Sequence, residues 1–128
     1  MRWRFVSRQA LLLLHDESLA EHGGAAGIRD EGLLDSALAR PSHLIAYGNP
    51  DTADLAAAYA FGLAKNHPFV DGNKRAAFLA AGLFLALNGQ RLKASQADAT
   101  LTMLALAAGD MTEHEYAAWL RAHAVPRA

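Results

Sequence analysis

Apolar residues recur along this chain with the three-to-four-residue spacing of helices and hardly anywhere with the alternation of strands. The first such stretch, which contains four consecutive leucines, predicts an amphipathic helix over about residues 7–22. Gly23 and Gly24 follow it, as glycine commonly does where a helix ends. Asp30 is suited to cap a second, short helix, and we expect Pro41 to end that helix.

Two strongly apolar segments occupy the middle of the chain. Asp51 or Thr52 is suited to cap the first, which runs to about Asn66, and its alanines lie all the way round, which is typical of a helix buried on most sides. The second runs from about Asn73 to Asn88. The polar stretch between them, HPFVDGNKR, predicts the turn of a central helical hairpin.

Two further helices are expected near the C-terminus. Ser95 with Asp98, and Thr112 with Glu115, have the spacing of capping boxes, and each pair precedes an apolar helical pattern. Six or so helices around one central hairpin therefore make an all-α fold, which we expect to be a single domain over residues 1–128.

One segment does not fit this helical pattern. Residues 41–50, PSHLIAYGNP, have a proline at each end and a turn signal at the end, so they are the one place where a short flap hairpin is expected. Short extended pairings at residues 3–6 and around Ile45 also stay open.

Composition narrows the function classes. The chain has no cysteine, which excludes thiol catalysis, cysteine-ligated zinc and disulfides. A formal net charge of −1 makes nucleic acid an unexpected partner. The longest apolar run, residues 76–87, is too short to cross a bilayer, and the leucines near the N-terminus stop at His15 without a cleavage site. We therefore expect a cytoplasmic protein without a membrane segment or a signal peptide.

The polar turn carries the candidate chemistry. Pro68 makes a continuous helix through it unfavourable, so the next helix should begin near Gly72 and Asn73. The start of a helix presents free backbone N–H groups and a positive dipole end, which together bind phosphate readily. Lys74 and Arg75 place two cations in that first turn, where they oppose the dipole unless a polyanion neutralises them.

Two other side chains of the turn suit phosphate transfer. Asp71 is a hard oxygen donor of the kind that holds Mg²⁺ against phosphates. His67 is the natural general base for an attacking hydroxyl, a role for which proteins use histidine most often. Phe69 is expected to anchor the turn in the core. The alternative is purely structural, with Asp71 as a helix cap and the cations as a solvated face, but the five polar residues together favour a phosphate site.

The motif H-P-F-V-D-G-N-K-R resembles the signature of the Fic/Doc superfamily, and within it the Doc (death-on-curing) branch of toxin–antitoxin toxins. GIRDEGLLDSALARP, residues 27–41, resembles the N-terminal signature of that branch, and LFLALNG further along also matches. The resemblance covers most of the chain. The phosphate-binding loops GxxxxGK[ST] and G-x-G-x-x-G are both absent.

This resemblance implies roles for the turn residues. His67 would be the base and Asp71 the Mg²⁺ ligand, while Gly72, Asn73, Lys74 and Arg75 would hold the phosphates of ATP. Fic adenylyltransferases have a glycine at the position of Lys74 and a second arginine at that of Phe78. The Doc pattern instead implies kinase chemistry, with transfer of the γ-phosphoryl group to a threonine of elongation factor Tu and a halt of translation.

Alternatives and partners follow from the same resemblance. Transfer of AMP or another nucleotidyl group on this scaffold, and an anion-binding interaction domain without turnover, both stay open. No Ser or Thr has Glu four residues later, so the self-inhibitory motif [S/T]-x-x-x-E-[G/N] of some Fic proteins is absent, and a separate antitoxin is expected.

Residues outside the turn are weaker candidates. Tyr47 and Gly48 in the expected flap either dock a target segment by strand pairing or form an ordinary connection. Arg29 and Asp30 are expected to fix the loop and cap a helix rather than touch substrate. Four acidic and histidine residues near the N-terminus are interpreted as a solvent-exposed helix face rather than a metal site. They are His15, Glu17, Glu21 and His22.

Overall fold

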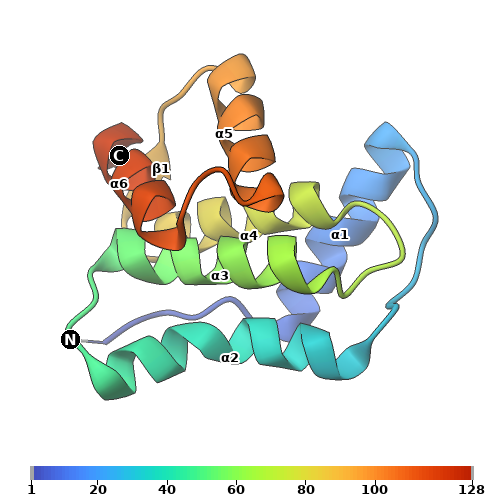
Figure 1. Ribbon diagram of the computed structural model, residues 1–128, viewed down its shortest axis with the longest axis horizontal. Coiled ribbons are helices and arrows are strands. Elements are labelled where there is room, and N and C mark those ends of the chain that lie inside the picture. The colour runs from blue at the N-terminus through green and yellow to red at the C-terminus, as the bar shows by residue number, and fades with distance from the viewer. Residues whose placement is uncertain (1, 128) are drawn as a thin grey trace.

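The computed structural model describes residues 2–127, which form six helices and one small sheet (Figure 1). The elements in chain order are α1 (Arg8–His22), α2 (Glu31–Tyr47), α3 (Thr52–Asn66), α4 (Asn73–Leu87), β1 (Gln90–Leu92), α5 (Gln96–Ala108), α6 (Glu113–His123) and β2 (Ala124–Pro126). The expected all-α class with a central α3–α4 hairpin is confirmed.

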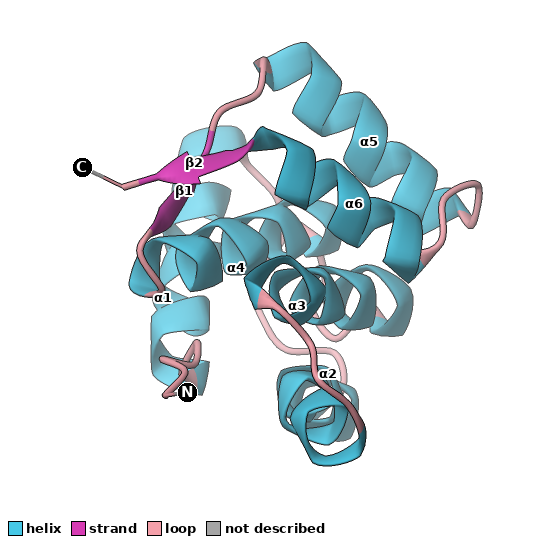
Figure 2. Ribbon diagram, turned by 90° about the vertical axis from the view of Figure 1, so that its left-hand side faces the viewer, coloured by secondary structure: helices cyan, strands magenta, loops and turns pink. Residues whose placement is uncertain are grey.

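Helix α3 is the centre of the packing. It contacts α4, α2, α5 and α6, while α1 packs against α4 (Figures 1 and 2). All alanines of α3 are buried, which confirms that this helix is buried on most sides. Helix α2 approaches it closely at Gly62, where a Cβ atom would lie only 3.1 Å from the Cα atom of Ala37. The turn between α3 and α4 lies at one end of this bundle, on the right of Figure 1.

Most helix starts expected from the sequence are confirmed. The Ser7, Asp30 and Asp51 side chains accept the backbone N–H three residues on, and Asp51 and Thr112 form full capping boxes. Ser95 accepts the N–H of Asp98, but the reciprocal bond of a capping box is not formed. The Asp98 carboxylate instead accepts Trp119 Nε1–H at 3.2 Å.

The short helix ending at Pro41 and the flap over residues 41–50 are wrong. Helix α2 continues through Pro41 to Tyr47, and Ile45 is helical rather than extended. A proline inside a helix costs about 3 kcal/mol. Here the Pro41 ring is fully buried and Leu44 and Ile45 pack on the core, each contributing on the order of 1–3 kcal/mol of burial energy, so packing outweighs the lost hydrogen bond.

The extended pairing expected at residues 3–6 is also not formed. Side chains hold this segment instead: Asn88 bonds both the N–H and the C=O of Arg4, and the Tyr59 hydroxyl accepts Val6 N–H at 3.1 Å. The sheet lies elsewhere, where β1 and β2 run antiparallel with Arg91 opposite Val125. Over residues 2–127 no helix has the length and apolar character needed to cross a membrane.

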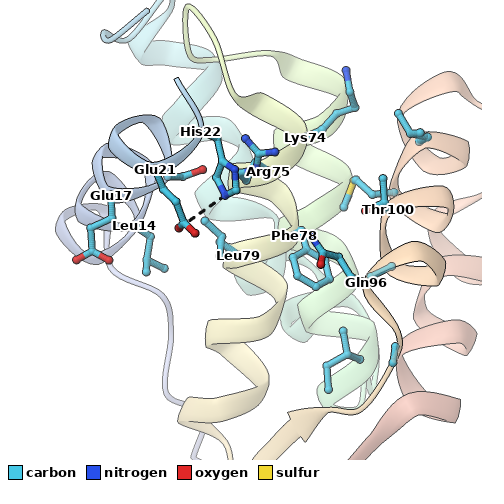
Figure 3. Close-up of a pocket in the computed structure, with 16 residues that line it drawn as sticks. Leu14, Glu17, Glu21, His22, Lys74, Arg75, Phe78, Leu79, Gln96 and Thr100 are labelled. Carbon is cyan, nitrogen blue, oxygen red and sulfur yellow. Dashed lines mark ion pairs between the residues drawn. The ribbon is translucent and has the colours of Figure 1, made fainter. Parts of the chain in front are cut away.

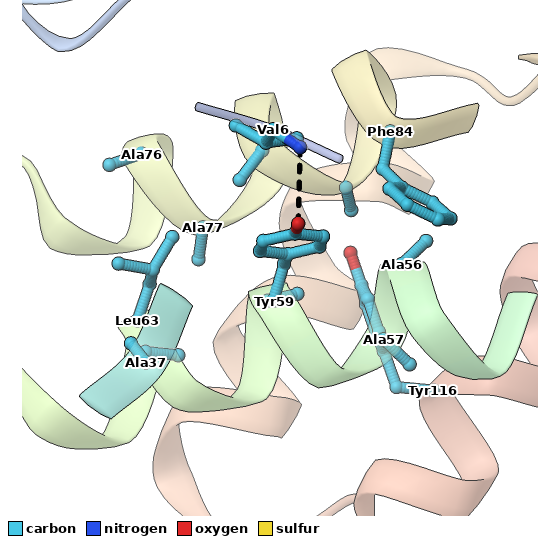
Figure 4. Close-up of a cluster of buried hydrophobic side chains, with 14 of the residues drawn as sticks. Val6, Ala37, Ala56, Ala57, Tyr59, Leu63, Ala76, Ala77, Phe84 and Tyr116 are labelled. Carbon is cyan, nitrogen blue, oxygen red and sulfur yellow. Dashed lines mark hydrogen bonds between the residues drawn. The ribbon is translucent and has the colours of Figure 1, made fainter. Parts of the chain in front are cut away.

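Two buried tyrosines make a matched pair for a stability test (Figure 4). Tyr59→Phe strands the buried N–H of Val6, so we expect the free energy of unfolding in urea to fall by about 1–3 kcal/mol. The Tyr116 hydroxyl is buried without a partner in the described chain, and burial raises its pKa. Tyr116→Phe should therefore leave the stability unchanged or raise it by up to about 1 kcal/mol. Equal losses from both variants would contradict this assignment.

The charge network at the start of α3 predicts an acid-sensitive contribution to stability. Arg121 donates Nε–H and Nη2–H to the Asp51 carboxylate, and this lowers the pKa of Asp51 from 3.8 to about 2. A lowered carboxyl pKa contributes stability above the unfolded value, and that stability is lost as the pH falls from about 4 through 2. Because the pair is half exposed, we expect a loss of only about 1 kcal/mol. Asp51→Asn, which keeps the cap, should flatten the unfolding free energy over this pH range; an unchanged slope would contradict it.

Candidate active site

The candidate site begins at a strained residue. His67 caps α3 with φ 49° and ψ 55°, and it is the one non-glycine residue in 2–127 with a positive φ. A non-glycine residue in this region costs of order 1–3 kcal/mol and persists only where its surroundings hold it. The strained turn brings the chain abruptly out of α3 before Pro68 and leaves His67 exposed at the surface.

Arg29 supplies much of that restraint. Its Nε–H donates to the carbonyl of His67 at 2.7 Å, and its Nη2–H donates to the carbonyl of Asn66 at 2.9 Å. The backbone N–H groups of Arg29 and Asp30 both donate to the carbonyl of Pro68, at 2.7 and 3.1 Å. The expectation that these two residues fix the loop and cap α2 is therefore confirmed.

Asn73 holds the loop from within. Its side chain accepts Phe69 N–H at 2.9 Å and donates to the Phe69 carbonyl at 3.0 Å, and it is buried. The Phe69 ring is 1% exposed, which confirms it as the apolar anchor. The amide side chain of Asn73 is thus committed to the loop, and the part of Asn73 suited to a phosphate is its backbone N–H.

His15 is the residue that the sequence interpretation missed. It is buried, its Nε2 lies 2.8 Å from the Asp71 carbonyl oxygen, and its ring stacks on Phe69 with centroids 3.8 Å apart. The interpretation of this part of α1 as a wet face is therefore wrong for His15. The available signal was its spacing, because Leu11, His15 and Ser18 follow the i, i+4, i+7 pattern of one buried face. In residues 2–127 no three potential ligands gather into a metal cluster.

The Asp71 side chain lies at the outer edge of the loop. Its Oδ1 accepts Gly72 N–H at 3.0 Å and its Oδ2 accepts Ala25 N–H at 3.3 Å, which orients an exposed carboxylate with lone pairs to spare. Mg²⁺ in phosphate-transfer sites is commonly held by one or two carboxylates together with phosphates and water. The residues present therefore fit a nucleotide-borne Mg²⁺ better than a metal caged by protein alone.

The start of α4 is open to an anion. Gly72 is its N-cap in the left-handed region, with φ 75°, and no side chain caps the first turn. Lys74 and Arg75 are exposed, and neither forms an ion pair within the described chain. Uncapped N–H groups and two unneutralised cations thus meet at one point, as the sequence predicts.

A cavity of about 620 Å³ between α1, α4 and α5 opens beside these cations (Figure 3). Arg75 of α4 and His22 of α1 both line it, and the dashed line in Figure 3 marks the ion pair between His22 Nε2 and Glu21, 3.6 Å apart. Phe78, one turn further along α4, belongs to the apolar part of the wall. The volume is in the range of small-molecule sites, about 300–1,000 Å³.

The loop carbonyls explain why the exposed face of the turn suits an anion. The carbonyls of Asn66, His67, Pro68, Phe69 and Asp71 all accept hydrogen bonds from the protein. The partial negative charge of these carbonyls, which would repel a phosphate, is thereby offset by hydrogen-bond donors. At the start of α4 this leaves the N–H groups, the two cations and one exposed carboxylate, Asp71, to set the electrostatic field.

Tyr47 and Gly48 are not brought to this loop. They line a second cavity with Arg40 and Glu113, at the far end of α2 from Asp30. A 17-residue helix is about 25 Å long, so they lie well away from His67. Tyr47 is 92% exposed but ends a helix, so the expected strand pairing has no edge strand to use. Docking of a target there stays a prediction.

Comparison with known proteins agrees with this geometry. A model described as "Fic/DOC family" matches residues 5–85. This range includes the loop and the three residues whose side chains hold it, His15, Arg29 and Asn73. The chain belongs to the Fic/DOC family. It is 34% identical over 119 residues to the "Protein kinase doc" of Escherichia phage P1, covering 92% of this chain and 94% of the phage protein.

A second member of the family is more similar over a shorter stretch. The chain is 51% identical over 75 residues to a "Toxin Doc" of Mycolicibacterium smegmatis. That match covers 56% of this chain and 57% of the mycobacterial toxin. Both relatives are Doc-type members, which agrees with the branch that the loop motif resembles.

The two hydrogen bonds from the Asn73 side chain to Phe69 predict a local effect for one variant. Asn73→Ala leaves the buried N–H and C=O of Phe69 without partners, so we expect the free energy of unfolding to fall by about 2–4 kcal/mol. Hydrogen exchange at the Val70 amide, which donates to Gly27 at 3.0 Å, should become faster. Asn49→Ala, at an exposed asparagine, is the control. Unchanged exchange at Val70 in the Asn73 variant would show that its side chain does not hold the loop.

Proposed function

We propose that this protein is a Doc-type toxin that transfers the γ-phosphoryl group of ATP to a hydroxyl of another protein. The observation that carries the proposal is the uncapped start of α4, where Lys74 and Arg75 lie without an ion-pair partner in residues 2–127. Two cations at a helix N-terminus are unfavourable until an anion neutralises them. A triphosphate supplies that charge.

The loop residues divide the reaction among them. His67 takes the proton of the attacking hydroxyl as its oxygen bonds the γ-phosphorus, and the bond from that phosphorus to the β–γ bridging oxygen breaks to release ADP. The backbone N–H groups of residues 73–75, with the Lys74 and Arg75 side chains, hold the phosphates. Asp71 would hold Mg²⁺, which when bound neutralises phosphate charge.

Phe78 and Lys74 favour γ-phosphoryl over AMP transfer. In the family pattern of adenylyltransferases, a second arginine at the position of Phe78 seats the outer phosphates. Here that position is an apolar wall of the cavity, so the outer phosphates have no cation one turn along α4. The cations that remain for the γ-phosphate are Lys74 and Arg75, at the start of α4 after the loop that carries His67, so this is where the γ-phosphate is best placed. The similarity over nearly the whole chain to a protein named a kinase supports the same direction.

Elongation factor Tu and an antitoxin complete the proposal. A threonine of the elongation factor is the target that the Doc resemblance implies, and its modification would halt translation. One relative carries the name "Toxin Doc", and this chain lacks the self-inhibitory motif of other Fic proteins. Both facts support control by a separate antitoxin protein.

The direct test uses ATP labelled at one phosphorus at a time. Purified protein is incubated with magnesium, elongation factor Tu and, in parallel, α- or γ-labelled ATP. We expect label on the elongation factor from γ-labelled ATP alone. Label from α-labelled ATP would overturn kinase chemistry in favour of AMP transfer. If neither ATP labels the elongation factor, the assay is repeated with a cell lysate as the source of target proteins. No label on any lysate protein, while the purified protein still binds ATP, would support an anion-binding domain without turnover.

The general-base role predicts the effect of removing His67. His67→Ala should lower the transfer rate by at least about 100-fold, the usual minimum for an acid–base group, while nucleotide affinity changes little. His43→Ala is a matched control, since His43 is exposed on α2. The rate is measured at saturating ATP, and urea unfolding checks the fold. A His67→Ala protein that keeps its transfer rate would exclude the base assignment.

A further inference from the structure

His15 makes two contacts with the candidate loop from a neighbouring helix. Its side chain is 3% exposed, its Nε2 is 2.8 Å from the carbonyl oxygen of Asp71, and its ring stacks on Phe69 at an interplanar angle of 15°. A carbonyl oxygen only accepts hydrogen bonds, so Nε2 must carry the proton in this contact. His15 therefore holds the loop by a directed hydrogen bond as well as by packing.

The Asp71 carbonyl belongs to the same peptide unit as the Gly72 N–H. In a trans peptide the C=O and N–H point in opposite directions. Holding the carbonyl toward α1 therefore turns the Gly72 N–H away from α1, where it donates to the exposed Asp71 carboxylate at 3.0 Å. One hydrogen bond thus sets the direction of a donor at the entrance of the candidate phosphate site.

This peptide unit has little else to fix it. Gly72 has φ 75° and no side chain, and glycine adopts either hand of the backbone, so rotation of the preceding peptide is inexpensive. The Gly72 N–H donates to the carboxylate of Asp71, and the other oxygen of that carboxylate accepts Ala25 N–H at 3.3 Å. In residues 2–127 His15 makes the one hydrogen bond to this peptide from outside residues 71 and 72.

A rotated peptide would harm phosphate transfer in two ways. It would remove the Gly72 donor, and it would point the Asp71 carbonyl at the phosphate. Gly72 also packs against His15, because a Cβ atom placed on it would lie 3.4 Å from His15 Nε2. The imidazole therefore lies close to the Cα atom of Gly72 as well as to the Asp71 carbonyl.

We propose that His15 is a positioning residue for phosphoryl transfer, which orients the peptide between Asp71 and Gly72 so that Gly72 N–H faces the transferred phosphate. This inference rests on the proposed kinase function. His15 acts through the loop backbone and does not touch the substrate.

Two substitutions separate the hydrogen bond from the packing. His15→Phe keeps an aromatic ring against Phe69 but cannot donate, whereas His15→Gln keeps a donor with a similar reach. We expect kcat to fall about 10–100-fold in His15→Phe, as for a lost or misaligned transition-state donor, with KM for ATP changed less than about threefold. His15→Gln should restore most of kcat. If His15→Phe fails to fold, His15→Met is the second non-donor variant.

A readout without turnover keeps this proposal separate from the kinase assignment. The backbone amide resonance of Gly72 is followed by NMR while inorganic pyrophosphate is added. We expect a shift in the wild type and in His15→Gln and a loss of most of it in the non-donor variant, with the fold intact. If the wild type transfers no phosphoryl group but shows this pattern, the kinase proposal fails and the positioning role stands. A non-donor variant with wild-type kcat, or with a wild-type response at Gly72, would overturn the positioning role.

Discussion

The candidate site depends on one constraint, which is that five carbonyl groups of the α3–α4 loop are engaged by hydrogen bonds from the protein. Arg29 and the adjoining backbone hold three of them, Asn73 holds one and His15 holds one. The contacts come from three separate parts of the chain. Without them, a loop rich in carbonyl dipoles would present negative charge beside the start of α4 and would repel a phosphate.

The same contacts account for strain that the loop could not hold alone. The left-handed backbone of His67 and two unneutralised cations in the first turn of α4 all lower stability. The surrounding packing tolerates these costs because α3 is buried on nearly every side and the Phe69 ring anchors the loop in the core. The two cations at the start of α4 thus lower the stability of the free protein, and a bound anion would restore it. This pattern suits a binding site better than a structural turn.

Local sequence signals were enough to predict five of the six helices, most of their N-caps and the polar loop, because each depends on neighbouring residues. The helix through Pro41 was not predictable in this way, since its cost is local while its compensation is burial against α3. Strands β1 and β2 pair residues more than thirty positions apart, and each is three residues long, too short for a period to show. The clamps by Arg29, Asn73 and His15 likewise join parts of the chain that only the fold brings together, although the spacing of His15 marked its buried face.

A crystal structure of the protein with magnesium and a non-hydrolysable ATP analogue would test the central claim most directly. A preformed cradle predicts a phosphate at the backbone N–H groups of residues 72–75, with the five loop carbonyls still on their present partners and a backbone shift below about 1 Å. Phosphates bound elsewhere, or a loop whose carbonyls exchange partners when the analogue binds, would contradict the account.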